Sequence, residues 1–288
     1  MNTMCKVLKV SKSGFYDWLK RKEAPPTSTE QTRQERCELI EQIFREYRGI
    51  YGYRKVYHEL RRRQVSCSLN TIYADCKRLG LKSITRKKYR VQTTDSKHDL
   101  PIANNVLSRD FKAEKPNEKW VTDITYISTL EGFLYTVAII DLFSRKVIGY
   151  AMADHLRTEL VLDALRMTLG RGRKLVGEIW LHSDRGVQFS SEMFRDVLNL
   201  AGIGQSMSRK GDCWDNAPCE SWFGKMKVEW IYPNRIFATR KEAELSIIEY
   251  IEMFHNSKRL HQALDYRTPN EVEAEYAKIL TAPPLSVK

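Results

Sequence analysis

The spacing of apolar residues along the second half of the chain predicts an alternation of strands and helices. Between residues 120 and 152, runs rich in Val, Ile, Thr and Tyr are separated by turn residues, which is typical of a strand meander. The expected elements, in chain order, are strands at Trp120–Ile127, Phe133–Leu142 and Lys146–Met152, a helix at Thr158–Leu169, a strand at Glu178–His182, a helix at Ser191–Leu200, a strand at Ile203–Met207 and helices from Ala217. This order predicts an α/β domain over residues 118–275, in which helices flank a mixed five-stranded sheet.

Residues 29–82 show helical apolar spacing and are expected to form three helices. Thr29 is a candidate N-cap for the first helix, Ser68 or Asn70 for the third, and Gly80 is suited to end the third. Two helices, a short turn and a third helix favour an all-α helix-turn-helix DNA-binding domain. An ordinary three-helix bundle that contacts protein is the alternative, since helical periodicity alone does not select a partner.

Three further segments complete the expected organisation. Residues 1–24 are expected to form a short helical segment, with Trp18 on its apolar face and Ser13 as a candidate N-cap. Residues 83–117 lack periodicity and begin with a basic run, so they are expected to form a basic linker. Residues 276–288 are expected to be a tail.

Charge narrows the choice of partner. The net charge is +12, and residues 51–100 hold thirteen Lys and Arg against four acidic residues, a net charge of +9. A localised basic block of this kind favours double-stranded DNA, whose phosphates bind Lys and Arg. Candidate DNA contacts in and after the third helix are Lys77, Arg78, Arg86, Lys87 and Lys88.

No targeting segment or membrane span is expected. The first residues lack the apolar run of a signal peptide, and no apolar stretch is long enough to cross a bilayer. The six cysteines form no C-x-x-C pair, so a structural zinc site is not predicted and reduced thiols in a cytoplasmic protein are the simplest account.

Three acidic residues stand where a sheet-based catalytic site would need them. Asp123 lies within the first predicted strand, Asp184 just after the fourth, and Glu220 at the start of a helix for which Asn216 is a candidate cap. Each has an ordinary explanation on its own, as a strand-edge, turn or helix-terminus residue. Together they match the oxygen ligands of two divalent cations, Mg²⁺ or Mn²⁺, that clamp a phosphoryl group during in-line displacement.

These residues and their flanks resemble a known family, the catalytic subunit of insertion-sequence-three transposases, which is similar to retroviral integrase. The resemblance covers nearly the whole chain. Thirty-five residues separate Asp184 from Glu220, which is the family's spacing. The motifs that carry it are Tyr51-Gly52-Tyr53-Arg54, Trp120–Tyr126, His182–Phe189, Asp215–Ser221 and the segment from Tyr250 to Pro269.

The resemblance implies a ribonuclease-H-like integrase core and DNA cleavage followed by strand transfer. It implies catalysis and metal binding by Asp123, Asp184 and Glu220, and a DNA-facing role for Lys227. It also implies self-association in a synaptic complex, and a possible partner encoded by an upstream reading frame. The His/His/Cys/Cys module of retroviral integrases is absent here.

Several nearby residues are weaker candidates. Arg185 and Lys225 are possible DNA contacts, whereas Asp141 is expected to serve a strand end and His182 to be structural. Two other functions stay open at this point. A ribonuclease-H-like nuclease would share the carboxylates but only hydrolyse, and a DNA-binding regulator would use residues 29–90 without catalysis.

Overall fold

The structure is a computed structural model. It describes Cys5 and Val7 and residues 9–84, 100–173, 175, 177–210, 212–234 and 236–281. The chain divides into two compact units, residues 1–83 and 84–288, and each is described by itself. Within the described residues, no helix is long and apolar enough to cross a membrane.

The first unit is entirely helical. Its helices are α2 (Lys12–Glu23), α3 (Ser28–Glu46), α4 (Tyr53–Arg62) and α5 (Leu69–Arg78). The last three enclose a small apolar core that includes Ile40, Ile43, Val56, Leu60 and Ile72, all with no exposed surface. Two helices, a short turn at residues 63–68 and a third helix therefore form as the sequence predicted.

Two helix starts differ from the expected positions. The N-cap of α3 is Thr27, because the Glu30 carboxylate accepts from Thr27 N while the Thr27 hydroxyl accepts from Glu30 N, which completes a capping box. Thr29 therefore lies inside the helix. Likewise, Ser11 caps α2 by accepting from Gly14 N at 3.0 Å, so the prediction of Ser13 was wrong. Of the two candidates for α5, Ser68 is the cap.

The second unit is built on a mixed five-stranded sheet. Its strands are β1 (Lys119–Thr129), β2 (Gly132–Asp141), β3 (Val147–Ala153), β4 (Ile179–Ser183) and β5 (Ile203–Met207), in the spatial order β3-β2-β1-β4-β5. The first three strands are antiparallel, while β4 pairs parallel to β1 and β5 parallel to β4. The predicted strand meander and the predicted mixed five-stranded sheet are both confirmed.

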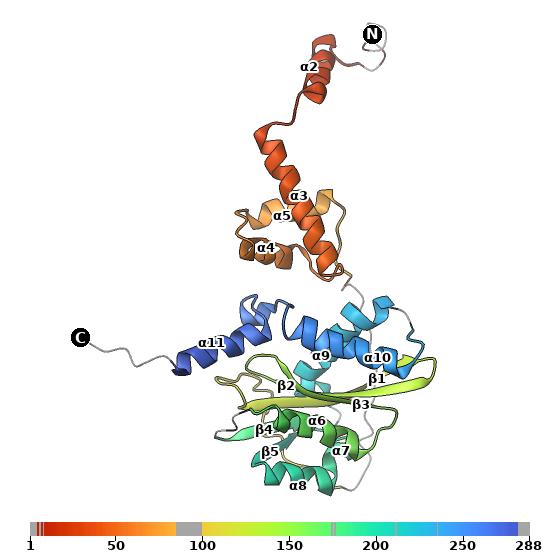
Figure 1. Ribbon diagram of the computed structural model, residues 1–288, viewed down its shortest axis with the longest axis vertical. Helices are drawn as coiled ribbons and strands as arrows, with labels where there is room; N and C mark the ends of the chain where they lie inside the picture. Colours follow the sequence, from red (N-terminus) through yellow and green to blue (C-terminus); the bar gives the residue numbers. More distant parts are fainter. Residues whose placement is uncertain are drawn as a thin grey trace, which may run out of the picture. The chain divides into compact units, whose positions relative to one another are not determined.

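Helices cover both faces of this sheet (Figure 1). On one face lie α6 (Thr158–Gly170), α7 (Val187–Ser190) and α8 (Glu192–Leu200), and on the other lie α9 (Ala217–Met226) and α10 (Arg240–Ile248). The remaining helical segments are η1 (Cys213–Asn216), η2 (Lys227–Ile231), η3 (Tyr232–Asn234), η4 (Glu249–His255), η5 (Gln262–Leu264) and α11 (Pro269–Thr281). The helix-rich end that the sequence predicted after residue 217 is confirmed.

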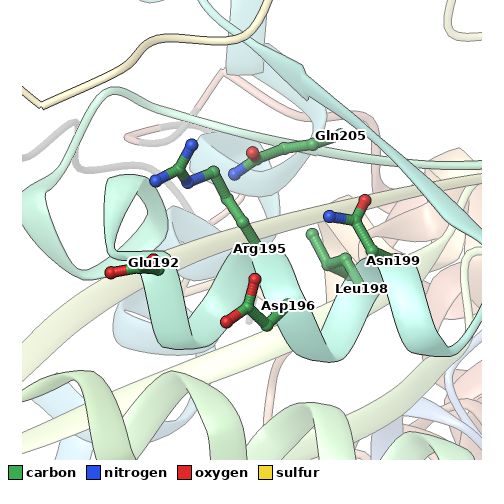
Figure 2. Close-up of a pocket in the computed structure, with 6 residues that line it drawn as sticks. All are labelled: Glu192, Arg195, Asp196, Leu198, Asn199 and Gln205. Atoms are coloured by element: carbon green, nitrogen blue, oxygen red, sulfur yellow. The ribbon is translucent and has the colours of Figure 1, made fainter.

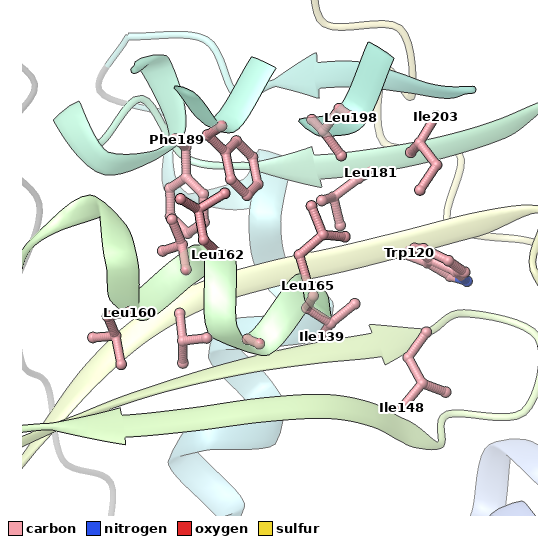
Figure 3. Close-up of a cluster of buried hydrophobic side chains, with 14 of the residues drawn as sticks. Trp120, Ile139, Ile148, Leu160, Leu162, Leu165, Leu181, Phe189, Leu198 and Ile203 are labelled. Carbon is pink, nitrogen blue, oxygen red and sulfur yellow. The ribbon is translucent and has the colours of Figure 1, made fainter. Parts of the chain in front are cut away.

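The main core lies between the sheet and the α6–α8 face. Trp120, Ile139 and Ile148 of the first three strands pack with Leu162 and Leu165 of α6 (Figure 3). All five are at most 1% exposed. Burial of apolar area on this scale is the main favourable term in folding, so this cluster holds the sheet that carries the site.

Gly149 allows α6 to lie close against β3. A Cβ atom at this position would stand 1.9 Å from Thr168 Oγ1 and 2.5 Å from the Ala164 carbonyl oxygen. Neither neighbour can yield easily, because the Thr168 hydroxyl donates to that carbonyl at 2.9 Å. Gly149→Ala is therefore expected to lower the free energy of unfolding by about 1 to 3 kcal/mol, as overpacking of a core does.

Chemical denaturation measures this loss, with Gly170→Ala as the matched control. Gly170 ends the same helix α6, and nothing lies within 4 Å of a Cβ atom built on it. The control is expected to be neutral or slightly stabilising, since alanine is the better helix former. Equal free energies of unfolding for the two variants would contradict the close β3–α6 packing.

Candidate active site

The register of β1 and β4 brings two of the predicted carboxylates together. The parallel pairing of these strands ends with Val121 opposite His182. Asp123 and Asp184 each lie two residues beyond that last pair, so they occupy corresponding positions. Asp123 lies on β1, where side chains alternate between the two faces, so it points to the same face as Val121 and away from the face of the core residue Trp120. Asp184 follows the end of β4 at Ser183.

Glu220 reaches the same region from the first turn of α9. Pro218 suits this turn, where its missing N–H would have no helical partner. Asn216 precedes the helix, but its side chain does not cap it. Instead, the Asn216 amide donates to the Thr122 carbonyl oxygen at 3.1 Å, beside Asp123. This bond ties the start of the Glu220 helix to the strand that carries Asp123.

The three carboxylates influence one another electrostatically. The pKa of Asp123 lies well above its ordinary value, first because of burial and then because of the negative charges of Asp184 and Glu220. The same three negative charges also act on the pKa of the buried Cys219 thiol. Burial raises its pKa, and Asp123, Asp184 and Glu220 raise it further. The site thus holds an excess of negative charge.

Lys227 brings a positive charge to this region. Lys227 follows α9, where the helix continues as the π-helical segment η2, and its side chain is only 7% exposed. Its ammonium nitrogen stands 5.3 Å from the centre of the Tyr126 ring. Burial lowers the pKa of Lys227 to about 8, although the negative charge of Asp123 acts in the opposite direction. The sequence predicted a DNA-facing lysine here and did not predict its burial.

Two other titratable residues have structural partners. Fully buried Asp141 accepts from Asn117 N at 2.8 Å and Phe143 N at 2.9 Å and pairs with Arg173, which suits a strand-end role. His182 is also fully buried, between the hydroxyls of Ser206 and Ser208. Burial lowers the pKa of His182 to about 4, so the ring is neutral near pH 7.

The other predicted DNA contacts are spread over both units. Lys77 and Arg78 are exposed on α5, and Arg78 pairs with the buried Asp75 at 3.1 Å. Lys225 is exposed on α9, whereas Arg185 donates from Nε to the Ser208 carbonyl oxygen at 2.6 Å. A further three, Arg86, Lys87 and Lys88, lie outside the described residues.

One hollow in the described part of this unit lies apart from the three carboxylates. This small hollow of about 200 Å³ lies over α8 and β5, and its lining includes Glu192, Arg195 and Gln205 (Figure 2). Within the described segments, no three acidic, histidine or cysteine side chains are grouped closely enough to enclose a metal ion as they stand.

Comparison with known proteins places both units among described families. The integrase core domain matches residues 113–213 and again 201–269, and an HTH-like domain matches residues 31–89. An uncharacterized 31 kDa protein of insertion element IS600 from Shigella sonnei is 38% identical over 274 residues, covering 95% of this chain and 98% of its own. The transposase InsF of insertion sequence IS3A from Escherichia coli is 36% identical over 274 residues, covering 95% and 93%.

Solved structures show weaker likeness. The simian T-cell lymphotropic virus intasome, solved with the PP2A regulatory subunit B56 gamma, is 13% identical, covers 77% of this chain and 73% of its own, and gives a TM-score of 0.48. The HTLV-2 integrase catalytic core domain in complex with magnesium, in its trimeric form, is 16% identical, covers 56% and 99%, and gives 0.42.

Proposed function

Because the chain belongs to the insertion-sequence-three family of transposases, we propose that Asp123, Asp184 and Glu220 are the carboxylates with which it cuts and joins DNA. The chain is a DNA transposase, a polynucleotidyl transferase that acts on DNA phosphodiesters. The observation that best supports these three residues is their placement: Asp123 lies on β1, Asp184 directly follows β4, and the Asn216–Thr122 hydrogen bond ties the start of the Glu220 helix to β1. Burial first, and then the negative charges of Asp184 and Glu220, raise the pKa of Asp123, as expected for neighbouring acids.

The donor set fits divalent cations. Carboxylate oxygens are the ligands that Mg²⁺ and Mn²⁺ prefer, and excess negative charge at a protein site favours a hard cation. We propose that Asp123 and Asp184 hold two such ions and that Glu220 completes the coordination of one. When bound, the ions would activate the attacking hydroxyl and stabilise charge on the phosphate.

The chain's own residues would position the DNA for two successive steps. Water first cuts at an element end and leaves a 3′-hydroxyl. That hydroxyl then forms a bond to a target phosphorus as the target's own 3′-oxygen leaves. His182 takes no part in this proposal, because it is buried, neutral and bonded to two serines.

Lys227 is proposed to meet a DNA phosphate beside the carboxylates. Its burial against Tyr126 removes water from the ammonium group, and a partly desolvated charge binds a phosphate more strongly than a solvated one. Arg185, Lys225, Lys77 and Arg78 are proposed as further phosphate contacts, which give affinity with little sequence information. Self-association in a synaptic complex, and a partner from an upstream reading frame, belong to the same proposal.

A thermal unfolding experiment tests the metal site. Without metal, Asp123→Asn is expected to leave the midpoint unchanged or raise it by a few degrees, because it removes a buried charge that its neighbours repel. With millimolar Mn²⁺, the wild-type midpoint is expected to rise, since an ion that binds only the folded state stabilises it. The variant is expected to lose most of that rise.

Asp141→Asn is the comparison variant for Asp123→Asn in this unfolding experiment. Asp141 is buried too, but it pairs with Arg173 and accepts backbone hydrogen bonds, so this variant is expected to be less stable with or without Mn²⁺. An Asp123→Asn midpoint that falls as far as that of Asp141→Asn would assign Asp123 a structural role. An undiminished Mn²⁺ response in Asp123→Asn would remove it from the metal site.

A further inference from the structure

Asp215 is a buried acid that the proposed chemistry does not use. It is fully buried, and five hydrogen bonds reach its two carboxylate oxygens. Arg209 supplies three of them, from its backbone N at 2.9 Å, Nε at 3.0 Å and Nη2 at 2.8 Å. Arg109 Nε donates at 2.9 Å and Asn105 Nδ2 at 2.8 Å. With both oxygens occupied, Asp215 is unsuited to bind a metal ion or move a proton.

Two of these donors come from a segment that precedes the matched integrase core domain, which begins at residue 113. Residues 100–112, here called the arm, follow the edge of the sheet at β5. The Asn104 carbonyl oxygen accepts from Met207 N at 3.3 Å, and Val106 N donates to Ser206 Oγ at 3.0 Å. The sequence suggested a linker here, whereas the structure bonds the arm to the catalytic unit.

The arm has two consecutive residues with positive φ angles, the second of which is Arg109. Ser108 and Arg109 have φ angles of 45° and 67°, in the left-handed region that residues with a side chain rarely adopt. Such conformations persist only where surrounding contacts stabilise them, and they cluster at functional sites. The contacts are present, because Arg109 Nε bonds to Asp215 and Nη2 bonds to Asp212.

The loop that holds Asp215 is fixed at both of its ends as well. Before it, the Ser208 carbonyl oxygen accepts from Arg185 Nε at 2.6 Å. After it, Asn216 donates to the Thr122 carbonyl oxygen. Asp215 stands between these two anchors and five residues before Glu220. Its bonds to the arm therefore act on the segment that leads directly into α9.

We propose that Asp215 is a positioning residue, and that the arm, Arg109 and Arg209 form a brace that sets the place of Glu220 relative to Asp123 and Asp184. This inference rests on the proposed role of Glu220. In this proposal, residues 100–112 belong to the catalytic unit because they support the position of Glu220. Loss of the brace would let the loop at 208–216 move and would place the Glu220 carboxylate less often in its working position.

The test measures motion and catalysis in the full chain. Arg109→Gln and Asp215→Asn are each expected to speed hydrogen–deuterium exchange by about tenfold or more in peptides covering 212–226, since bonds to charged groups are lost. With a saturating pre-cleaved duplex from the sequence flanking the reading frame, the joining rate is expected to fall about 10- to 100-fold, as for other supporting contacts. Affinity for that duplex is expected to stay within about twofold, because the DNA-binding surface is untouched.

Two further variants separate positioning from general stability. Arg166→Gln breaks an exposed pair with Asp163 on α6 and is expected to change neither exchange at 212–226 nor joining. Arg109→Lys keeps the charge but not the planar fork, so it is expected to retain part of the joining rate. If a variant were merely less stable overall, hydrogen–deuterium exchange would speed up throughout the sheet and not only in the 212–226 peptides.

Three results would overturn the brace. The first is faster exchange in the arm alone, with the 212–226 peptides and the joining rate unchanged. The second is slow joining with unchanged exchange at 212–226. The third is a proportional loss of DNA affinity and joining, which would make Arg109 a DNA contact. Retained joining in Glu220→Gln would defeat the proposed role of Glu220 instead, while the exchange result would still decide whether the brace exists.

Discussion

Asp123→Asn is expected to reduce strand joining in Mg²⁺ by about a thousand-fold or more. A metal site contributes several kcal/mol to transition-state stabilisation, and about 4 kcal/mol corresponds to that factor in rate. Asp184→Asn and Glu220→Gln are expected to show losses of similar size. Each substitution is nearly isosteric and removes one charge from a crowded site, so the fold and the affinity for DNA should change little. A quantitative gel assay of joined product measures the rate.

Asp163→Asn is a suitable control for the carboxylate series. Asp163 is an exposed acid on α6, 59% exposed at its side chain, and it pairs only with its exposed neighbour Arg166 in the contacts described. Its loss is expected to leave joining unchanged. Full activity of Asp123→Asn, Asp184→Asn or Glu220→Gln would reject the catalytic assignment of that residue and leave the other two to be explained.

Removal of residues 1–83 is expected to weaken DNA binding by about a hundred-fold at 0.2 M salt and to flatten its salt dependence. Each phosphate contact contributes about −0.9 to the slope of log K against log salt, so loss of at least three contacts should lower the slope by about 3. The helical unit is compact by itself and matches an HTH-like domain. Fluorescence anisotropy with labelled duplex DNA over a series of salt concentrations measures both quantities.

A single substitution refines this prediction in the full chain. Lys77 is exposed on α5, so Lys77→Ala is expected to lower the slope by about 1 and to weaken all DNA sequences alike. Lys241→Ala, at an exposed lysine of α10 that pairs with Glu244, is the control and should leave the slope unchanged. If the shortened chain binds DNA with the same salt slope as the full chain, residues 1–83 form a protein-contact module.

The order of elements could be predicted because burial imposes a period on the sequence. Strands buried on a sheet repeat every two residues and helices every 3.6, so β1 to β5, α6 and α8 were each visible as a pattern, whereas the four-residue helix α7 is too short to show one. Helix caps were harder. Thr27 and Thr29 are both good N-cap residues, but only Thr27 has a glutamate three positions later, Glu30, and their reciprocal hydrogen bonds favour Thr27. Hydrophobic spacing does not report this preference, but the spacing of Thr27 and Glu30 does.

The residue types and spacing of the candidate site could be predicted from the sequence. The burial and charge environment of its side chains could not. Spacing along the chain cannot show that Lys227 is buried against Tyr126, because that contact joins segments about a hundred residues apart. The arm was missed for a related reason. Its residues are held by hydrogen bonds to Ser206, Met207 and Asp215, and such contacts leave no apolar period. In the sequence, the polar side chains of Asn105 and Asp215 were the only sign that these two segments bond to each other.

A strand-joining assay of the wild-type chain tests the central claim most directly. The substrate is a pre-cleaved duplex with a 3′-hydroxyl end, taken from the sequence that flanks the reading frame, together with plasmid target DNA. The account predicts covalently joined product in Mg²⁺ and none in EDTA. Cleaved target without joined product would indicate a nuclease that only hydrolyses. Bound but chemically unchanged DNA in Mg²⁺ would contradict the catalytic role of the three carboxylates.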